Sequence, residues 1–291
     1  MSKLAFLASK ATLPGSPVRR EDAHEHDLQV AALKTPLKRR GLELVALDWM
    51  DRSVDWSDFS AAVIGTTWDY WDHQDFFLET LRGIEAAGTP VFNPPDLVAW
   101  NSRKTYLQDL EARGARIIPT LWPSRPSVDE IIRSFDTLGT NDIVIKRQVG
   151  AGAFDQIRYR KGDNISDYGF DAMIQPFVPT IQTEGEYSIV MIDGNLSHAL
   201  LKRPQSGDYR IQSLYGGQEE RVDLSSDDLK SAKDILDCLD DTPLYARVDM
   251  VRGADGDLIL MELELIEPYL YPEQSDDLGV RYADGLIRRL S

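Results

Sequence analysis

Three carboxylates in the last third of the sequence form its strongest chemical signal. Glu262 and Glu264 lie two residues apart in an apolar, strand-like segment, and Asp249 lies in the strand-like segment before it. Alternation along a strand places Glu262 and Glu264 on one face, and hairpin pairing can bring Asp249 beside them. Crowded carboxylates repel one another unless a cation neutralises them, and hard oxygen ligands of this kind suit Mg²⁺. The alternative is a solvated strand edge whose acids face water.

Two lysines are candidates for contacting a phosphate. Lys146 lies in a strand-like segment that runs into a loop containing Gly150 and Gly152. A lysine there can contact a phosphate while the backbone amides of the loop cover it, although the order of residues is not that of a Walker A motif. An ordinary glycine turn is the alternative. Lys104 is expected early in a helix, where a cation is unfavourable without a nearby anion; its alternative is a solvated surface lysine.

A basic cluster stands out against the acidity of the chain. It comprises Lys202, Arg203 and Arg210, with Arg247 as a candidate fourth cation. A local positive site in an acidic protein suggests capture of a small anion. Ion pairing with the abundant acids is the alternative.

Composition limits the class of protein. The 291 residues include 32 Lys and Arg against 48 Asp and Glu, which gives a formal net charge of −16 and disfavours nucleic acid as a partner. The single cysteine, Cys238, rules out an internal disulfide and fits a reducing compartment. No apolar run approaches the roughly 20 residues that span a bilayer, and the apolar stretch 4–8 is short for a signal peptide. We therefore expect a cytoplasmic protein without a membrane partner.

The first hundred residues alternate between strand-like and helix-like segments. This alternation favours a parallel sheet with right-handed crossovers and with ligand loops at the carboxyl ends of its strands. The predicted strands are residues 4–9, 42–49, 61–67 and 90–93, and the predicted helices are residues 76–87 and 26–40, the latter broken or kinked by Pro36. Candidates to face a substrate are Thr66, Thr67, Trp68 and Asp69. Trp68 equally suits packing between domains.

After two prolines at 94–95 the regular alternation of strands and helices gives way to predicted hairpins. Two hairpins are predicted, each from two strands around a glycine-containing turn. The hairpins comprise residues 186–194 with 196–203, and 245–252 with 258–268; further strands are 117–119, 142–148 and 172–178, and helices are 101–113, 229–240 and 283–290. The domains expected are 1–96, an N-terminal α/β unit; 97–179, a central lid lobe; and 180–291, a C-terminal lobe.

The order of these elements resembles the ATP-grasp superfamily. A lysine-bearing helix, a strand-Lys-Gly loop, the strand MIQPFV, a Glu-Gly-Glu strand, a basic hairpin, an Asp strand and a Glu-x-Glu strand follow in the sequence typical of that fold, over roughly residues 93–268. The chain looks nearest to the glutathione synthetase-like ligases. The segments TTWDYW and YARVDMVR…LMELELIEP look like the group that contains the D-cycloserine-forming O-ureidoserine cyclo-ligase.

The resemblance implies a nucleotide site. Lys104 and Lys146 would contact the phosphates of ATP, and residues 150–153, including Gly150 and Gly152, would form a mobile loop over them. The residues that would surround adenine and ribose are Gln175, Phe177 and Val178 on the hinge strand, with Glu184 or Glu186 near the ribose.

It also implies a catalytic centre. Asp249, Glu262 and Glu264 would bind Mg²⁺, although the third position is Asn in most of the superfamily and Glu264 here adds a negative charge. The catalytic cations would be Arg210, which stabilises an acyl phosphate, with Lys202 and Arg247; Arg203 would hold a substrate carboxylate.

Together these features predict an α/β ATP-grasp enzyme of three lobes. It would be an ATP- and Mg²⁺-dependent ligase that joins a small-molecule carboxylate to an amine through an acyl phosphate, with intramolecular ring closure as one form. An ATP-grasp small-molecule kinase would instead leave a stable phosphorylated product, and a non-catalytic nucleotide-binding protein would perform no chemistry. A homodimer is a further expectation taken from the family.

Overall fold

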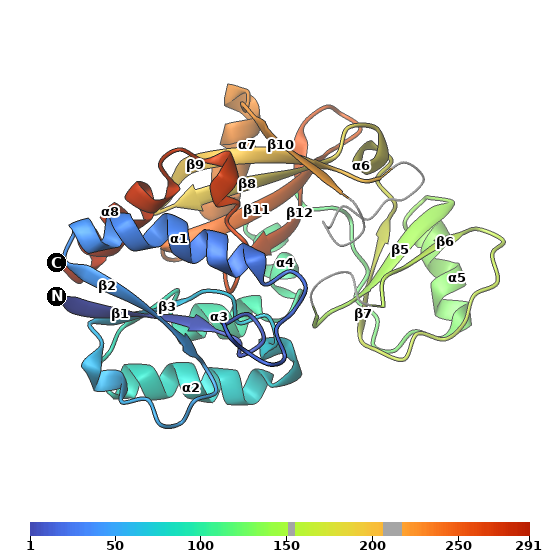
Figure 1. The fold of residues 1–291 in the computed structure, drawn as a ribbon. Helices are drawn as coiled ribbons and strands as arrows, with labels where there is room; N and C mark the ends of the chain where they lie inside the picture. The colour runs from blue at the N-terminus through green and yellow to red at the C-terminus, as the bar shows by residue number, and fades with distance from the viewer. Residues whose placement is uncertain (151–154, 206–216) are drawn as a thin grey trace.

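The first of three sheets is parallel. The computed structural model describes residues 1–150, 155–205 and 217–291. Its N-terminal sheet has the order β2-β1-β3-β4, which confirms the predicted parallel α/β unit (Figure 1). The strands are β1 (Ser2–Ala8), β2 (Leu42–Asp48), β3 (Ala61–Ile64) and β4 (Val91–Phe92); the helices are α1 (His24–Arg39) and α2 (Gln74–Ala86), and short 3-10 turns cover Trp56–Asp58 and Tyr70–Asp72. Of the break or kink expected at Pro36, the break is wrong, because helix α1 runs through Pro36 to Arg39.

The central lobe holds a small antiparallel sheet of order β6-β5-β7 (Figure 1). Its elements are α5 (Val128–Thr137), β5 (Asp142–Arg147), β6 (Ile157–Arg160) and β7 (Ala172–Pro176). Strands β5 and β7 were predicted from the sequence, whereas α5 and β6 were not. Helix α5 begins with a capping box between Ser127 and Glu130, and it packs Ile131 and Phe135 onto the sheet.

The C-terminal sheet is antiparallel, with the order β10-β9-β8-β11-β12. Both predicted hairpins are confirmed, whereas β10 was missed because QEERV lacks the apolar alternation of a strand. The elements are α6 (Thr180–Thr183), β8 (Glu186–Ile192), β9 (Asn195–Arg203), β10 (Gln218–Val222), α7 (Ser226–Leu236), β11 (Tyr245–Arg252), β12 (Leu258–Glu264), a 3-10 turn η4 (Pro272–Gln274) and α8 (Leu278–Leu290).

The predicted helix over 101–113 is wrong in one respect that concerns the site. Helix α3 (Pro95–Asn101) ends at Asn101, and α4 (Tyr106–Ala112) begins only after a turn at 102–105. Lys104 therefore lies in the turn, where its backbone N–H donates to the carbonyl of Gln148 at 2.8 Å. Helix α3 begins with Pro95, a position that suits proline because the first N–H groups of a helix have no partner within the helix.

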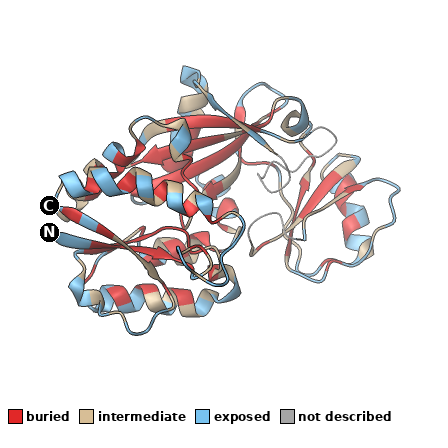
Figure 2. Ribbon diagram, viewed as in Figure 1, coloured by how far each residue is buried: buried red, intermediate tan, exposed pale blue. Residues whose placement is uncertain are grey.

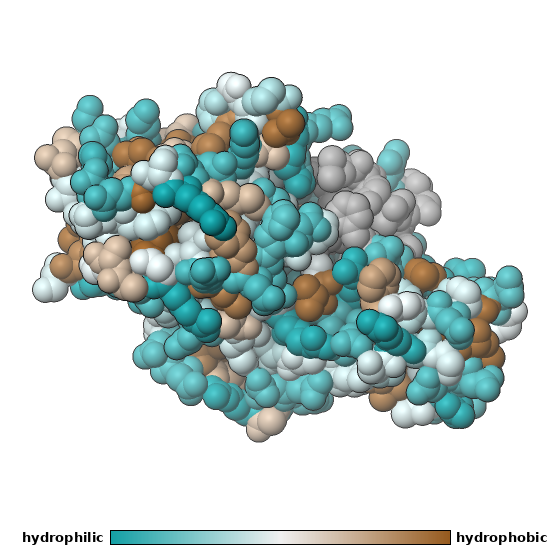
Figure 3. Space-filling model, turned by 90° about the horizontal axis from the view of Figure 1, so that it is seen from below, coloured by the Kyte–Doolittle hydropathy of each residue, from teal (hydrophilic) through white to brown (hydrophobic). Residues whose placement is uncertain are grey.

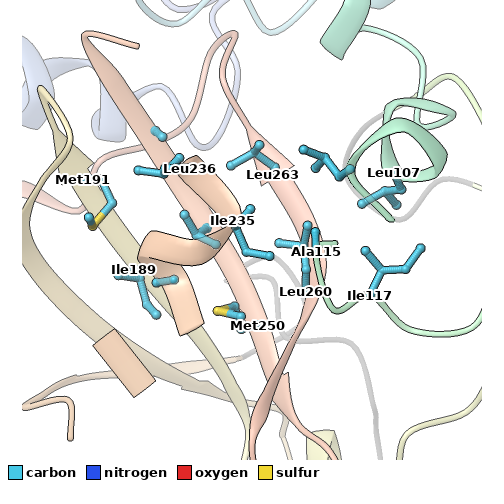
Figure 4. Packing of buried hydrophobic residues seen from close by; sticks show 14 of the residues in the cluster. Leu107, Ala115, Ile117, Ile189, Met191, Ile235, Leu236, Met250, Leu260 and Leu263 are labelled. Atoms are coloured by element: carbon cyan, nitrogen blue, oxygen red, sulfur yellow. The ribbon is translucent and has the colours of Figure 1, made fainter. Parts of the chain in front are cut away.

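The N-terminal and C-terminal sheets share a hydrophobic core. Side chains of β1, β3, α1, β8, β11 and α8 form one buried cluster, and buried residues concentrate in the sheets and on the inner sides of the helices (Figure 2). In α8, Gly279 allows close packing on α1, since a Cβ there would lie 2.1 Å from the carbonyl oxygen of Ala32. The other face of the C-terminal sheet is covered by α4 and α7 (Figure 4).

Among the described residues, no helix has both the length and the apolar character to cross a bilayer. The face in Figure 3 is mostly hydrophilic, with hydrophobic residues in small separate groups.

Candidate active site

One face of the C-terminal sheet gathers the predicted charged residues. Side chains alternate between the two faces of this sheet. Ile189, Met191 and Met250 face the apolar cluster under α7 (Figure 4), so the residues before and after each of them along the strand face the opposite side. The cross-strand pairs on that other face are Asp249–Glu262, Arg247–Glu264 and Glu186–Lys202. The expectation that hairpin pairing brings Asp249 beside Glu262 is confirmed.

Arg247 links two of the carboxylates. It is 8% exposed, its Nη2 lies 2.9 Å from Asp249 Oδ2, and it also donates to Glu264. A further N–H donates to the carbonyl of Tyr269 at 3.2 Å. Burial alone would lower the pKa of Arg247, but Asp249 and Glu264 raise it well above its ordinary value. Arg247 is therefore a fixed cation at the centre of this face.

Lys202 is a second buried cation. It is 5% exposed, with Nζ 2.6 Å from Glu186 and 3.9 Å from Asp249. Burial raises the pKa of Asp249, but Arg247 and Lys202 outweigh that effect and hold it below its usual value. Ser188 donates a further hydrogen bond to Asp249. The second carboxylate oxygen of Glu186 is buried without a hydrogen-bond partner in the described structure.

Two lysines from separate elements converge on Glu262. Lys104, from the turn after α3, forms an ion pair with Glu262, and Lys146 on β5 lies within electrostatic range of both. Burial lowers the pKa of Lys104, yet Glu262 raises it above its ordinary value. For Lys146 burial prevails and the pKa is lowered. The structure thus brings together three residues that lie far apart in the sequence.

The end of β12 carries more negative charge than these cations balance. Burial raises the pKa of Glu264 to about 7, and Asp249 and Glu262 add to the effect. Burial and Glu264 also raise the pKa of Glu267 well above its usual range. Glu267 was missed as a site residue, although the ELIEP motif contains it. A divalent cation would relieve this excess, and the carboxylate donors fit Mg²⁺ by type.

The present arrangement of these side chains favours ion pairs. Within residues 1–150, 155–205 and 217–291, no group of three or more His, Cys, Asp or Glu side chains is arranged to hold a metal ion. Glu262 is paired with Lys104, and Glu264 with Arg247. Metal binding by these carboxylates stays a prediction.

Side chains from the α3–α4 segment fix the outer edge of β12. The Asn101 side chain donates to the carbonyl of Leu263 at 2.9 Å and accepts from the N–H of Leu265 at 3.1 Å. The Tyr106 hydroxyl accepts from the N–H of Leu263 at 2.8 Å. These bonds flank Glu264 and hold its backbone. These bonds were not predicted, because a lone Asn in a helix gives no signal of a distant strand.

The predicted adenine and ribose residues extend from the end of β7 to the start of β8. The Gln175 side chain is buried and donates to Thr120 Oγ1 at 2.9 Å, so it is engaged inside the lobe. The backbone N–H of Phe177 donates to the carbonyl of Asp142, and the carbonyl of Val178 accepts from Ile181.

The two candidate ribose acids have different partners. Glu184 accepts from the Tyr187 hydroxyl at 2.5 Å and from Arg252 at 3.1 Å, whereas Glu186 pairs with Lys202. Their nucleotide roles stay predictions.

The candidates on the N-terminal domain lie mostly inside it. Thr66 and Thr67 are fully buried, and Thr66 Oγ1 lies 2.6 Å from His26 Nδ1. Asp69 accepts from Trp49 Nε1 at 2.7 Å. The indole N–H of Trp68 donates to the carbonyl of Glu267 at 3.1 Å, which joins this domain to the segment after β12. The packing alternative for Trp68 therefore has direct structural support, and contact with substrate stays a prediction for all four candidates.

The remaining candidates lie at or beyond the edge of the described site. Arg203 is exposed and pairs with Glu220 at 2.6 Å. Gly150 has a positive φ of 140°. Gly152 and Arg210 lie outside the described residues.

Two family models match the chain in succession. Residues 4–93 match the N-terminal domain of D-cycloserine synthetase DcsG, and residues 131–264 match the ATP-grasp domain of prokaryotic glutathione synthetase. The cycloserine biosynthesis protein DcsG of Streptomyces lavendulae is 30% identical over 284 residues, which cover 91% of this chain and 94% of that protein. This chain belongs to the ATP-grasp ligases. A glutathione synthetase of Prochlorococcus marinus (strain MIT 9313) is also 30% identical, over 72% of this chain and 67% of its own length.

Solved structures agree with this family. The crystal structure of D-cycloserine synthetase DcsG aligns over 100% of both chains, with a TM-score of 0.83 and 27% identity. A D-alanine–D-alanine ligase from Bacillus anthracis shares the fold, with a TM-score of 0.70 and 16% identity over 100% of this chain and 97% of its own. The ATP-grasp ligase described here is accordingly an ATP-dependent enzyme that joins a carboxylate to an amine, as the sequence predicted.

Proposed function

We propose that this ATP-grasp ligase uses ATP and Mg²⁺ to join the carboxylate and a nitrogen of the same small molecule, closing a ring. The observation that carries the ATP-dependent activation is the convergence of buried and half-buried carboxylates and cations at one sheet face. Its cations come from separate elements of the central and C-terminal parts of the chain: Lys104, Lys146, Lys202 and Arg247. Ring closure is supported by the similarity, over nearly the whole length, to a protein named for cycloserine biosynthesis.

The first step transfers the γ-phosphoryl group of ATP to the substrate carboxylate. A carboxylate oxygen forms the new P–O bond, the bond to the β-phosphate bridging oxygen breaks, and ADP leaves. Two anions must approach each other, so fixed cations lower the barrier. Lys104 and Lys146 are suited to the nucleotide phosphates, and Arg247 and Lys202 to the carboxylate being activated. Mg²⁺ held by Asp249, Glu262 and Glu264 would supply further charge neutralisation when bound.

The second step forms the C–N bond. The substrate nitrogen attacks the carbonyl carbon of the acyl phosphate, the C–O bond to phosphate breaks, inorganic phosphate leaves, and the nitrogen releases its proton to solvent. Arg247 is held by Asp249, Glu264 and the Tyr269 carbonyl, so little reorganisation is required as charge develops. By resemblance, Arg210 and the loop with Gly150 and Gly152 would complete this centre and exclude water.

Phosphate release from single substrates tests the proposal. The purified enzyme is incubated with ATP, Mg²⁺ and one amino-group-bearing carboxylate at a time, with and without a second amine. We expect ADP and phosphate in equal amounts with one substrate alone, together with a cyclised product by mass spectrometry. A strict requirement for a second amine would refute ring closure, and a stable phosphorylated product would favour the kinase reaction. The Glu262→Gln variant serves as the inactive control.

A further inference from the structure

Glu267, just after β12, is a half-buried acid that the fold leaves unpaired. Within residues 1–150, 155–205 and 217–291, its carboxylate makes no ion pair, and its own backbone N–H is its only hydrogen-bond partner. Four other acids of the site are ion-paired, as Asp249–Arg247, Glu264–Arg247, Glu262–Lys104 and Glu186–Lys202. The Glu267 carboxylate is therefore available to a ligand.

Two side chains from other segments hold the backbone at Glu267 in place. The hydroxyl of Tyr245 on β11 donates to the carbonyl of Ile266 at 2.8 Å. The indole N–H of Trp68, in the loop after β3, donates to the carbonyl of Glu267 at 3.1 Å. A ligand that binds this carboxylate therefore meets a position that is already fixed, which lowers the entropic cost of binding.

The loop after β3 lies beside the face of the C-terminal sheet that carries Lys202 and Arg247, called the catalytic face below. Trp68 packs against a buried cluster that contains Leu200 and Tyr271. Leu200 lies two residues before Lys202 on β9, so both side chains are on the same face. The Arg247 guanidinium lies 5.5 Å from the centre of the Tyr271 ring. The junction between this loop and Glu267 is thus next to the cations assigned to carboxylate activation.

The carboxyl edge of the N-terminal sheet supplies a second, independent indication of a ligand. In the order β2-β1-β3-β4, the chain moves from β1 to β2 on one side and then to β3 on the other, and parallel sheets bind ligands at such a point. Ser9 follows β1 and Thr67 follows β3; both are fully buried, and their hydroxyls have no hydrogen-bond partner in the described structure. The fold itself does not use these polar groups, which points to a polar ligand at this edge.

The charge around Glu267 suits an organic cation. Burial raises the pKa of Glu267 well above its usual range, and Glu264 and Glu262 raise it further. Lys104 opposes this effect, but Lys104 is already paired with Glu262. An ammonium group can hydrogen-bond to one carboxylate, whereas Mg²⁺ takes several oxygen ligands, and the described residues contain no group of three acids arranged to hold a metal.

We propose that Glu267 binds an amino group of the substrate. The protonated amino group donates a hydrogen bond to the Glu267 carboxylate at the junction with loop 66–69. The carboxylate of the same molecule is then directed toward Arg247 and Lys202 by charge complementarity. This inference rests on the proposed function and adds to it a specificity-determining residue and a substrate class, small aminocarboxylates in preference to their hydroxy analogues.

A titration observed at Trp68 tests the site without turnover. The protein is labelled with 5-fluorotryptophan, and the Trp68 resonance in the fluorine NMR spectrum is assigned by its loss in Trp68→Phe. β-Alanine and 3-hydroxypropionate are titrated separately at equal ionic strength, since they differ only in an ammonium group against a hydroxyl. We expect a saturable shift with β-alanine and a dissociation constant at least about tenfold below that of 3-hydroxypropionate.

Glu267→Gln keeps the size of the side chain and removes its charge. In this variant the dissociation constant of β-alanine should rise at least about tenfold, and that of 3-hydroxypropionate should change less than about twofold. Glu79→Gln, which removes the same charge from an exposed residue of α2, should leave both unchanged. The Tm of Glu267→Gln should not fall, because the change removes repulsion by Glu264 and Glu262.

Several results would overturn the proposal. They are the absence of a saturable shift with β-alanine, equal dissociation constants for the two ligands, and an unchanged ratio of these constants in Glu267→Gln. A dissociation constant for Mg²⁺ that rises about tenfold in this variant would assign Glu267 to a metal ion instead, and a lower Tm would assign it a structural role. The comparison of the two ligands on the wild type needs no variant, so it decides the proposal even if Glu267→Gln does not fold.

Kinetics separate this inference from the proposed function. For any aminocarboxylate that supports phosphate release, Glu267→Gln should raise its KM at least about tenfold and change the KM for ATP less than about twofold. Equal turnover of the hydroxy analogue would refute the substrate class. If no carboxylate supports phosphate release, the proposed function fails, while the β-alanine titration still decides the role of Glu267.

Discussion

Removing the Asn101 side chain should loosen the strand that carries the candidate metal-binding glutamates. In Asn101→Ala, the carbonyl of Leu263 loses its donor at 2.9 Å and the N–H of Leu265 loses its acceptor at 3.1 Å. Both leucines are at most 1% exposed, so water does not readily replace the lost partners. Glu264 lies between them, and its backbone loses restraint on both sides.

The magnitude follows from the two lost hydrogen bonds. Each leaves a buried backbone group unsatisfied, at about 1–3 kcal/mol per group, and partial relaxation gives an expected total of about 2–4 kcal/mol. Unfolding entropy of about 2.1 cal mol⁻¹ K⁻¹ per residue amounts to about 0.6 kcal mol⁻¹ K⁻¹ for a chain of this length. The expected decrease in Tm is therefore about 3–7 °C.

Calorimetry measures the expected loss of stability, and the Mg²⁺ dependence of activity measures the expected effect on the metal-binding glutamates. Asn195→Ala is the matched control, since Asn195 is exposed and its side chain makes one local bond to the Asp193 carbonyl; its Tm should change by less than about 1 °C. The half-saturating Mg²⁺ concentration for activity should rise about tenfold or more in Asn101→Ala, because Asn101 holds a proposed ligand in place. A Tm within 1 °C of the wild type, or an unchanged Mg²⁺ dependence, would refute this account of the β12 edge.

Three further predictions concern activity, packing and pH. Glu262→Gln should lower kcat by at least about 10²-fold while its Tm stays within about 2 °C, because the side chain is 34% exposed and pairs near the surface; full activity would contradict the metal assignment. Gly279→Ala should destabilise the protein by about 1–3 kcal/mol in urea unfolding, since its Cβ would meet the Ala32 carbonyl, whereas Gly83→Ala, with open space around it, should be neutral or stabilising. Burial lowers the pKa of His198 from 6.5 to about 4, so the folded state binds fewer protons than the unfolded state, and about 2–3 kcal/mol of stability should be lost as the pH falls from 7 to 4.5. The measurement is the urea midpoint of unfolding at pH 7 and at pH 4.5. In His198→Gln the decrease in midpoint between the two pH values should be smaller than in the wild type, and an equal decrease would argue against the role of His198.

The sequence predicted the parts of the site that depend on local periodicity. Alternation around Asp249, Glu262 and Glu264, with a turn between the strands, was sufficient to place the three acids on one face, and the register confirms the pairing of Asp249 with Glu262. The lysine in β5 was likewise located from its strand and the following glycines. These signals involve residues whose spacing along one or two strands fixes their relative positions.

What the sequence did not predict depends on contacts between distant segments. The helix expected over 101–113 is interrupted at 102–105. Asn101, just before the interruption, bonds to β12, and Lys104 within it bonds to Gln148 just after β5; no local propensity encodes those partners. A pocket of about 240 Å³ combines residues from α1, β10 and the segment after β12, none of which is distinctive alone. Strands β6 and β10 are rich in charged residues, so their pattern does not separate them from loops.

The core shared by the first and last parts of the chain limits how such enzymes can be recombined. Leu33 and Leu37 of α1 are buried in one cluster with Tyr282 and Leu286 of α8, although some 250 residues of sequence separate the two helices. A chimera that exchanges residues 1–96 alone would set a foreign α1 against the native α8, with mismatched ridges at the glycine contact. Grafting of a new substrate-facing domain therefore has to transfer the C-terminal helix as well, so the two ends of the gene are expected to diversify together.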